Sequence, residues 1–313
     1  MPLRFPDRVR CGMVLPGGQR DDVLRGARAI EAAGFDSLWV GDHLSFHIPI
    51  IESLTLLSFA SAATERIRLG TAVYLLPLRH PTAIAKVTSS LDVLSGGRLT
   101  LGVGVGGEFP PEFEAVGVPV AERGARADEA IEILRRLWTE DGVVHQGAHY
   151  RFGPISLDPK PLQAAGPPII VGGRRGPTFR RAGQLGDGYV SHMCAADRFA
   201  ENLTKIRAHA AKVGRKAHPF EPMSFLFTLF DQSYEAALDR ATELLQRIYN
   251  VPFRDAAAKY CLLGRPEDCL EQMQRFARAG SRHIILSVLS DPTEAIELAR
   301  DSIIPEIHTI ATS

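Results

Sequence analysis

The sequence has no net charge, few lysines, few cysteines and no long apolar run. Its 36 Lys and Arg residues balance 36 Asp and Glu residues, so it lacks the strong positive charge of a nucleic-acid or anionic-membrane binder. Its four cysteines are widely spaced, without the close CxxC pairs of zinc or redox sites. No stretch of 18 apolar residues and no basic-then-apolar leader occurs. We therefore expect no membrane span, and we expect a cytoplasmic protein.

Several catalytic motifs are also missing from the sequence. There is no GxxxxGK[ST] sequence and no GxSxG sequence, which excludes a P-loop and an α/β-hydrolase nucleophile. The ten histidines do not cluster and no HxH follows the first predicted strand, so we expect no metal site. The few lysines fall in predicted helices or loops. No Schiff-base lysine is therefore expected at a strand end.

What the sequence does contain is a regular alternation of strand-like and helical patterns. Apolar residues at helical spacing, such as Val23, Ala27 and Ile30, are followed by a glycine and then by a short apolar run. Eight such runs are predicted strands: residues 9–14, 37–40, 68–74, 99–105, 168–171, 189–191, 223–230 and 283–288. Strands that alternate with helices pair in parallel. Eight of them predict a (β/α)8 TIM barrel, with residues 1–313 as one domain and irregular insertions at 143–163 and 246–263.

In such a barrel the functional residues lie where the strands end at the carboxyl face. The second predicted strand ends in Gly41, Asp42 and His43, and the fourth is followed by Glu108. An imidazole beside a carboxylate suits proton transfer. We predict His43, Glu108 and Asp42 as catalytic residues. The alternative is that Asp42 only caps the loop and His43 is merely exposed.

Glycines at two other strand ends predict ligand contacts. Gly102, Gly104 and Gly107 match the spacing of a dinucleotide fingerprint, but Pro110 and Pro111 follow where that motif needs a helix to begin at the glycines. These glycines instead favour close approach of the backbone to a flat ligand. The apolar tip of the third strand, residues 70–77, offers either a surface for a ring or an ordinary buried strand.

The fifth predicted strand leads into a glycine- and arginine-rich turn that opens a helix. Gly172 and Gly173 are followed by Arg174 and Arg175, and Thr178 lies in the first helical turn. Free backbone N–H groups, the helix dipole and nearby guanidinium groups together suit a phosphate. The alternative is a surface turn with solvated arginines.

Together these segments resemble the luciferase-like monooxygenase superfamily, and the resemblance covers almost the whole chain. It is carried by AGFDSLWVGDH, RIRLGTAVYLLPLRHPTAIAKVTSSLDVLSGGRLTLGVGVGGE, ERGARADEAIEILRRLW, PPIIVGG…RRAGQLGDGYV and LLGRPEDCLEQMQRFARAG, in that order. The resemblance implies a barrel that binds reduced flavin (FMN) or the deazaflavin F420 at its mouth. It places His43 beside the reactive edge of the ring. The implied cofactor-binding residues are Ala72, Val73, Tyr74, Gly104, Gly106, Gly107, Gly172, Gly173, Arg174, Arg175 and Thr178, with a cis peptide at Ala72-Val73.

The resemblance leaves two chemistries open. With reduced FMN, one oxygen atom would be inserted into a small organic substrate, and a separate reductase would supply the reduced cofactor. With F420, a hydride would pass between cofactor and substrate, and His43 or Glu108 would handle the proton. Some F420-using dehydrogenases of the family have a glutamate after the glycine run, as Glu108 stands here after one extra glycine.

Family members are commonly dimers or higher homo-oligomers, so the resemblance implies a homodimer or homotetramer. Two other functions remain open from the residues alone: a phosphate-binding barrel isomerase or lyase, and a barrel that binds flavin without catalysis. The sequence does not identify the substrate.

Overall fold

Eight parallel strands close into a barrel in the computed structural model, which describes residues 3–215 and 218–310. The strands are β2 (Arg10–Val14), β3 (Ser37–Val40), β4 (Arg68–Thr71), β6 (Leu99–Gly104), β9 (Ile169–Gly172), β10 (Gly188–His192), β12 (Glu221–Phe230) and β14 (His283–Val288). They run β10-β9-β6-β4-β3-β2-β14-β12, and parallel pairing of β10 with β12 closes the ring. The predicted (β/α)8 barrel is confirmed.

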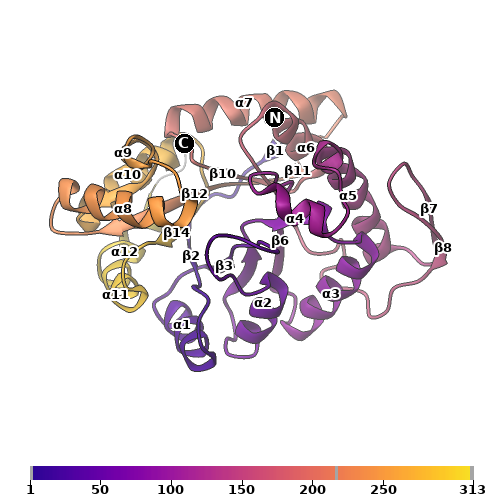
Figure 1. The fold of residues 1–313 in the computed structure, drawn as a ribbon, viewed down its shortest axis with the longest axis horizontal. Coiled ribbons are helices and arrows are strands. Elements are labelled where there is room, and N and C mark those ends of the chain that lie inside the picture. The colour runs from indigo at the N-terminus through magenta and orange to yellow at the C-terminus, as the bar shows by residue number, and fades with distance from the viewer. Residues whose placement is uncertain (1–2, 216–217, 311–313) are drawn as a thin grey trace.

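Helices surround the barrel (Figure 1). The longer ones are α1 (Arg20–Ala32), α2 (Ser53–Ser61), α3 (Pro81–Leu94), α5 (Arg123–Thr139), α6 (Gly176–Leu185), α7 (Ala196–Lys212), α8 (Tyr234–Tyr249), α10 (Pro266–Arg278) and α11 (Pro292–Ser302). Each turns an apolar stripe toward the strands, as α1 does with Val23, Ala27 and Ile30. Pro81 begins α3 at a position where no N–H is needed.

Short elements fill the remaining connections. They are β1 (Leu3–Arg4), β5 (Tyr74–Leu75), α4 (Pro110–Ala115), β11 (His218–Pro219), α9 (Arg254–Tyr260), β13 (Leu262–Gly264) and α12 (Ile304–Ile307). The insertion at 143–163 contains the antiparallel hairpin β7 (Val143–Gln146) and β8 (Arg151–Ile155), which lies outside the ring of helices (Figure 1). The insertion at 246–263 holds the end of α8, then α9 and the start of β13. Both lie where the sequence predicts departures from the repeating pattern.

Three of the longer helices, α2, α7 and α8, were not predicted from the sequence pattern. Helix α2 is apolar on most sides, with six of its nine residues buried, so it has no clear polar face. Helices α7 and α8 do carry apolar stripes, such as Phe199, Leu203 and Ile206 in α7. The apolar pattern could have predicted α7 and α8, whereas predicting α2 required knowledge of how that helix packs.

The barrel interior is a layer of large apolar side chains. Trp39, Ile170, Val190, Met223 and Ile285 are buried together between the strands. Above them, toward the carboxyl ends of the strands, lie four partly buried apolar side chains, those of Val14, Ala72, Val73 and Phe225. This upper layer leaves an apolar floor at the mouth of the barrel.

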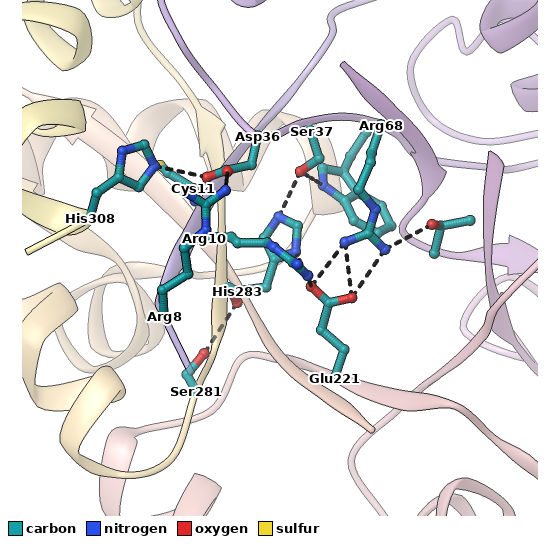
Figure 2. Close-up of polar contacts among 12 residues, drawn as sticks. Arg8, Arg10, Cys11, Asp36, Ser37, Arg68, Glu221, Ser281, His283 and His308 are labelled. Atoms are coloured by element: carbon teal, nitrogen blue, oxygen red, sulfur yellow. Dashed lines mark hydrogen bonds and ion pairs between the residues drawn. The ribbon is translucent and has the colours of Figure 1, made fainter. Parts of the chain in front are cut away.

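At the opposite end, charged and polar side chains close the barrel (Figure 2). Glu221, the first residue of β12, accepts hydrogen bonds from Arg10 at 2.8 Å and from Arg68 at 3.0 Å. His283, at the start of β14, bonds the same carboxylate through Nδ1 at 2.9 Å. Burial alone would raise the pKa of Glu221, but Arg68 and the other partners outweigh it and hold the pKa well below its usual range.

These bonds fix the proton positions on His283. Burial lowers the pKa of His283, so its ring is neutral near pH 7. An ionised Glu221 only accepts, so Nδ1 carries the proton and Nε2 accepts from the Ser37 hydroxyl at 2.6 Å. Trp39 Nε1 in turn donates to Ser37 Oγ at 2.6 Å. Because this cluster joins the amino ends of five strands, it stabilises the barrel at the face opposite the mouth.

Two further findings concern the described residues. No helix in that part of the chain has the length and apolar character needed to cross a membrane. Across the same residues, no three His, Cys, Asp or Glu side chains are placed to hold a metal ion.

Candidate active site

His43 lies at the mouth and is hydrogen-bonded to a buried glutamate from another unit. Its Nδ1 is 3.2 Å from Oε1 of Glu112, which belongs to the short helix α4. The Glu112 side chain is fully buried, and its Oε2 also accepts from the backbone N–H of Leu44 at 3.0 Å. With its second ring nitrogen left for a ligand, His43 is placed to exchange a proton while Glu112 holds the ring.

Asp42 has a different environment from its neighbour His43. Its buried carboxylate binds the Arg79 guanidinium through both oxygens, and it also accepts from Ser53 Oγ and from the backbone N–H of Leu75, each at 2.8 Å. The Arg79 guanidinium lies 4.4 Å from the centre of the Tyr74 ring. These bonds tie the loop after β3 to α2 and to β5. They do not favour the predicted catalytic role of Asp42 but indicate a positioning role for it.

This buried pair leads to a prediction about stability. We expect Asp42→Asn to lower the free energy of unfolding by about 3 kcal/mol, because the largely buried Arg79 loses its nearest carboxylate and keeps Glu52 at 4.0 Å. Urea unfolding monitored by circular dichroism measures this. Asp301→Asn, which removes an exposed pair with Arg300, is the matched control and should change stability by less than about 0.5 kcal/mol. Equal small effects for both variants would contradict the assignment.

The tip of the third barrel strand forms part of the mouth floor. The peptide bond between Ala72 and Val73 is cis, as the resemblance implies. The side chains of Ala72 and Val73 are partly exposed above the barrel core. Tyr74, which was also predicted to contact the cofactor, is instead buried beneath Arg79, so its ring is part of the protein core.

The glycines at the strand ends make room for protein atoms. A Cβ on Gly104 would come within 2.4 Å of Val73 Cγ2, and one on Gly172 within 2.6 Å of Val73 Cγ1. A Cβ on Gly107 would lie 2.8 Å from Arg123 Nε. Gly104 and Gly172 therefore admit Val73, and the contact of these glycines with a cofactor stays a prediction. Gly106 and Gly107 have positive φ angles of 58° and 102° and turn the chain toward Glu108.

Glu108 and Arg174 meet at the rim from two different strands. Arg174 Nη2 is 3.4 Å from Glu108 Oε1, and both side chains are at least half exposed. Burial raises the pKa of nearby Tyr249 to about 12, with the charge of Glu108 adding to the effect. Glu108 is thus an exposed rim group on the mouth, in contrast to the buried Glu112.

The turn between β9 and α6 has an open helix N-terminus. Arg175 is the N-cap residue of α6 and forms no side-chain cap, and a Cβ on Gly176 would meet nothing within 4 Å. Arg174 and Arg175 are exposed beside it. Thr178 is buried against Gly173, where a Cβ would lie 2.4 Å from Oγ1. The uncapped N–H groups and the two arginines fit a phosphate, whereas Thr178 shapes the turn from beneath.

Comparison with known proteins identifies the family of this chain. The family model described as luciferase-like monooxygenase matches residues 5–283. The chain belongs to the luciferase-like monooxygenase family. The resemblance seen in the sequence is thereby confirmed.

The relatives of this luciferase-like chain include F420-dependent dehydrogenases and an uncharacterised protein. An F420-dependent glucose-6-phosphate dehydrogenase of Nakamurella multipartita is 26% identical over 99% of this chain and 98% of the relative. The corresponding enzyme of Amycolatopsis mediterranei is 28% identical over 86% and 88% of the two chains. An uncharacterised protein of Mycobacterium tuberculosis is 33% identical, over 62% of this chain and 73% of its own.

Solved structures show the same luciferase-like fold. An F420-dependent secondary alcohol dehydrogenase, solved with an F420-acetone adduct, has a TM-score of 0.86 at 20% identity, covering 96% of this chain and 99% of its own. The oxygenating constituent of 3,6-diketocamphane monooxygenase of Pseudomonas putida, solved with FMN, has a TM-score of 0.80 at 20% identity, covering 97% and 100%. At these identities the likeness establishes the barrel.

Proposed function

We propose that this protein is an F420-dependent oxidoreductase that transfers a hydride between the cofactor and a small organic substrate at the mouth of the barrel. The names of the relatives and structural neighbours support the broader class, an oxidoreductase that uses F420 or FMN. The finer choice of F420 is supported by the relatives that align over nearly the whole chain. The observation that carries the proposal is the His43–Glu112 pair above the apolar floor formed in part by Ala72 and Val73.

The residues at the mouth suit a flat ring with a phosphate-bearing side chain. Val73 and Ala72 present partly exposed apolar surface on which a ring can lie. The uncapped start of α6, with Arg174 and Arg175 beside it, would hold the phosphate. When bound, F420 supplies a ring carbon that takes or gives a hydride.

The protein's own part is to move the accompanying proton. Glu112 Oε1 lies 3.2 Å from Nδ1 of His43, so a proton on Nδ1 is bonded to the carboxylate and Nε2 is left as the acceptor. Nε2 then takes the hydroxyl proton of a substrate that is being oxidised. The buried carboxylate stabilises the imidazolium that forms, in the same way that an aspartate supports histidine in a catalytic triad.

The two alternatives from the sequence have less support. An isomerase or lyase for phosphorylated compounds would use a lysine or paired carboxylates at the strand ends, and the sequence offers no lysine there. A barrel that only binds flavin would have no use for a buried glutamate held against a histidine at its mouth.

Anaerobic titration with reduced F420 and reduced FMN, side by side, tests the proposal. We expect micromolar affinity for F420 and at least about tenfold weaker binding of FMN. Preference for FMN, together with oxygen consumption when substrate is added, would shift the assignment to monooxygenation. Failure of both cofactors to bind would overturn the proposed function.

Arg174→Ala is expected to weaken F420 binding about fivefold to tenfold, because one exposed charge-assisted contact to the phosphate is lost. Turnover at saturating cofactor should stay within about threefold. Fluorescence titration gives the affinity and steady-state rates give the turnover. Arg300→Ala, a distant exposed arginine, is the matched control and should change neither value. An unchanged affinity in Arg174→Ala would place the phosphate elsewhere.

A further inference from the structure

A run of aromatic rings in contact with one another begins at the proposed proton-transfer group, and Phe46 also lines the cavity beside it. Phe46 stacks on the His43 ring, with 4.1 Å between ring centres and 16° between planes. Phe46 also meets Phe109 at 6.0 Å and Tyr249 at 6.1 Å, both nearly edge-on. One ring thus joins the loop after β3, the N-cap of α4 and the end of α8.

The same run of rings continues along β12 to the end of β10. Tyr249 lies 6.1 Å from Phe227, and Phe227 lies 5.6 Å from Phe225. His192 contacts both phenylalanines at 5.5 Å. Phe225 and Phe227 are two residues apart on a strand, so they project from the same face. We refer to Phe46, Phe109, Phe225, Phe227 and Tyr249 as the aromatic wall.

The polar members of this surface are neutral near pH 7. Burial raises the pKa of Tyr249 to about 12, and burial together with the charge of Arg174 lowers the pKa of His192 to about 4. The charged groups that act on these two rings or bond to His43 are Glu108, Arg174 and Glu112. Arg174, the guanidinium among them, already pairs with Glu108.

This arrangement is unsuited to a phosphorylated sugar. A second phosphate beside the wall would have to share Arg174 with Glu108 and with the cofactor phosphate that we place there. A sugar would also set its hydroxyl groups against aromatic faces, where they lose hydrogen bonds to water. The relatives named as glucose-6-phosphate dehydrogenases therefore do not indicate the substrate of this chain.

We propose that the substrate is a neutral, ring-bearing secondary alcohol, alicyclic or aromatic, which packs against the aromatic wall beside Phe46. This inference rests on the proposed function. The alcohol places its hydroxyl on Nε2 of His43, and an open cavity of about 420 Å³ lined by residues 43–50 adjoins the same loop. Apolar faces and flat rings gain most from contact with aromatic side chains.

The reaction balances with oxidised F420 as the electron acceptor. The carbon–hydrogen bond of the carbinol breaks, and its hydrogen leaves with two electrons as a hydride to the cofactor. The O–H bond breaks and its proton goes to His43. The C–O single bond becomes a carbonyl, so the alcohol is oxidised to a ketone and the cofactor is reduced.

The test compares cyclohexanol, 2-propanol and glucose 6-phosphate as reductants of F420 bound to the wild-type protein. We expect kcat/KM for cyclohexanol to exceed that for 2-propanol at least about tenfold, with no turnover of glucose 6-phosphate. Phe46→Leu keeps apolar volume but removes the ring. This variant should raise KM for cyclohexanol about tenfold and leave KM for 2-propanol within about twofold. Phe59→Leu, on the outer face of α2, is the control and should change neither.

The outcomes separate this inference from the proposed function. Preference for glucose 6-phosphate, an equal effect of Phe46→Leu on both alcohols, or turnover of none of the three overturns the substrate class. Calorimetric binding of cyclohexanone to the F420-loaded protein adds a readout without turnover, and absence of binding counts against the inference. Failure to bind F420 at all instead overturns the proposed function.

Discussion

His43→Ala is expected to lower the turnover number of the F420-loaded protein about a thousandfold, while F420 affinity changes less than about tenfold. The imidazole is the proton acceptor in the proposed reaction. His43 bonds to Glu112, and Glu112 also accepts from the Leu44 N–H. These bonds are within the protein, so losing the imidazole should leave the cofactor contacts in place. Steady-state reduction of F420 by the preferred alcohol gives turnover, and fluorescence titration gives affinity.

Two further variants separate proton transfer from simple loss of structure. Glu112→Gln keeps the volume and an acceptor for Leu44, but removes the charge that holds the His43 ring, so turnover should fall about tenfold to a hundredfold with cofactor affinity unchanged. His209→Ala removes the same kind of ring from the last turn of α7 on the outside of the barrel, and should leave turnover within about threefold. Wild-type turnover in His43→Ala would show that another group carries the proton.

Glu221→Ala is expected to lower the free energy of unfolding by about 4 kcal/mol. The substitution leaves Arg10, Arg68 and His283 around an empty position at the amino end of the barrel (Figure 2). Removing one partner from a mostly buried ionic cluster leaves the remaining charges without a counterion. Urea unfolding at pH 7 measures the loss.

A matched surface variant provides the control. Glu271→Ala removes an exposed pair with Arg275 one helical turn away, and it should cost less than about 0.5 kcal/mol. If Glu221→Ala were no more destabilising than Glu271→Ala, the cluster would have no role in holding the barrel closed.

The same cluster predicts the direction of the pH dependence. The lowered pKa keeps His283 neutral in the folded protein. In the unfolded chain the pKa of this histidine is about 6.5, so the unfolded chain binds an extra proton below that pH. The pKa of Glu221 is also lowered in the folded protein, so further stability is lost as the pH falls below the pKa of an unfolded glutamate, about 4.3. Stability should therefore decline as pH falls from 7 to 4. Thermal unfolding at pH 7, 5.5 and 4 measures this, and a stability that rose with acidification would contradict the protonation states.

The sequence predicted the barrel because its signals are local. Each of the eight strands is a short apolar run, and each helix that was predicted shows an apolar stripe within a dozen residues. The strand-end position of His43 follows from the same parsing, since the carboxyl ends of parallel strands share one face. The cis peptide at Ala72-Val73 came from the resemblance and not from the residues alone.

What the sequence could not predict depends on contacts between distant segments. Glu112 lies in a short helix after two prolines, and only the folded chain brings it to His43, 69 positions away. The Asp42–Arg79 pair joins residues 37 positions apart. The glycines at 104 and 172 were assigned to a ligand because nothing local shows that Val73 takes the space beside them.

A crystal structure of the protein with F420 would show where the cofactor binds. We expect the deazaflavin ring on Val73 with one edge toward His43, and the phosphate at the first turn of α6 beside Arg174 and Arg175. A ring bound away from the barrel mouth, or a phosphate held away from α6, would overturn the proposed cofactor site.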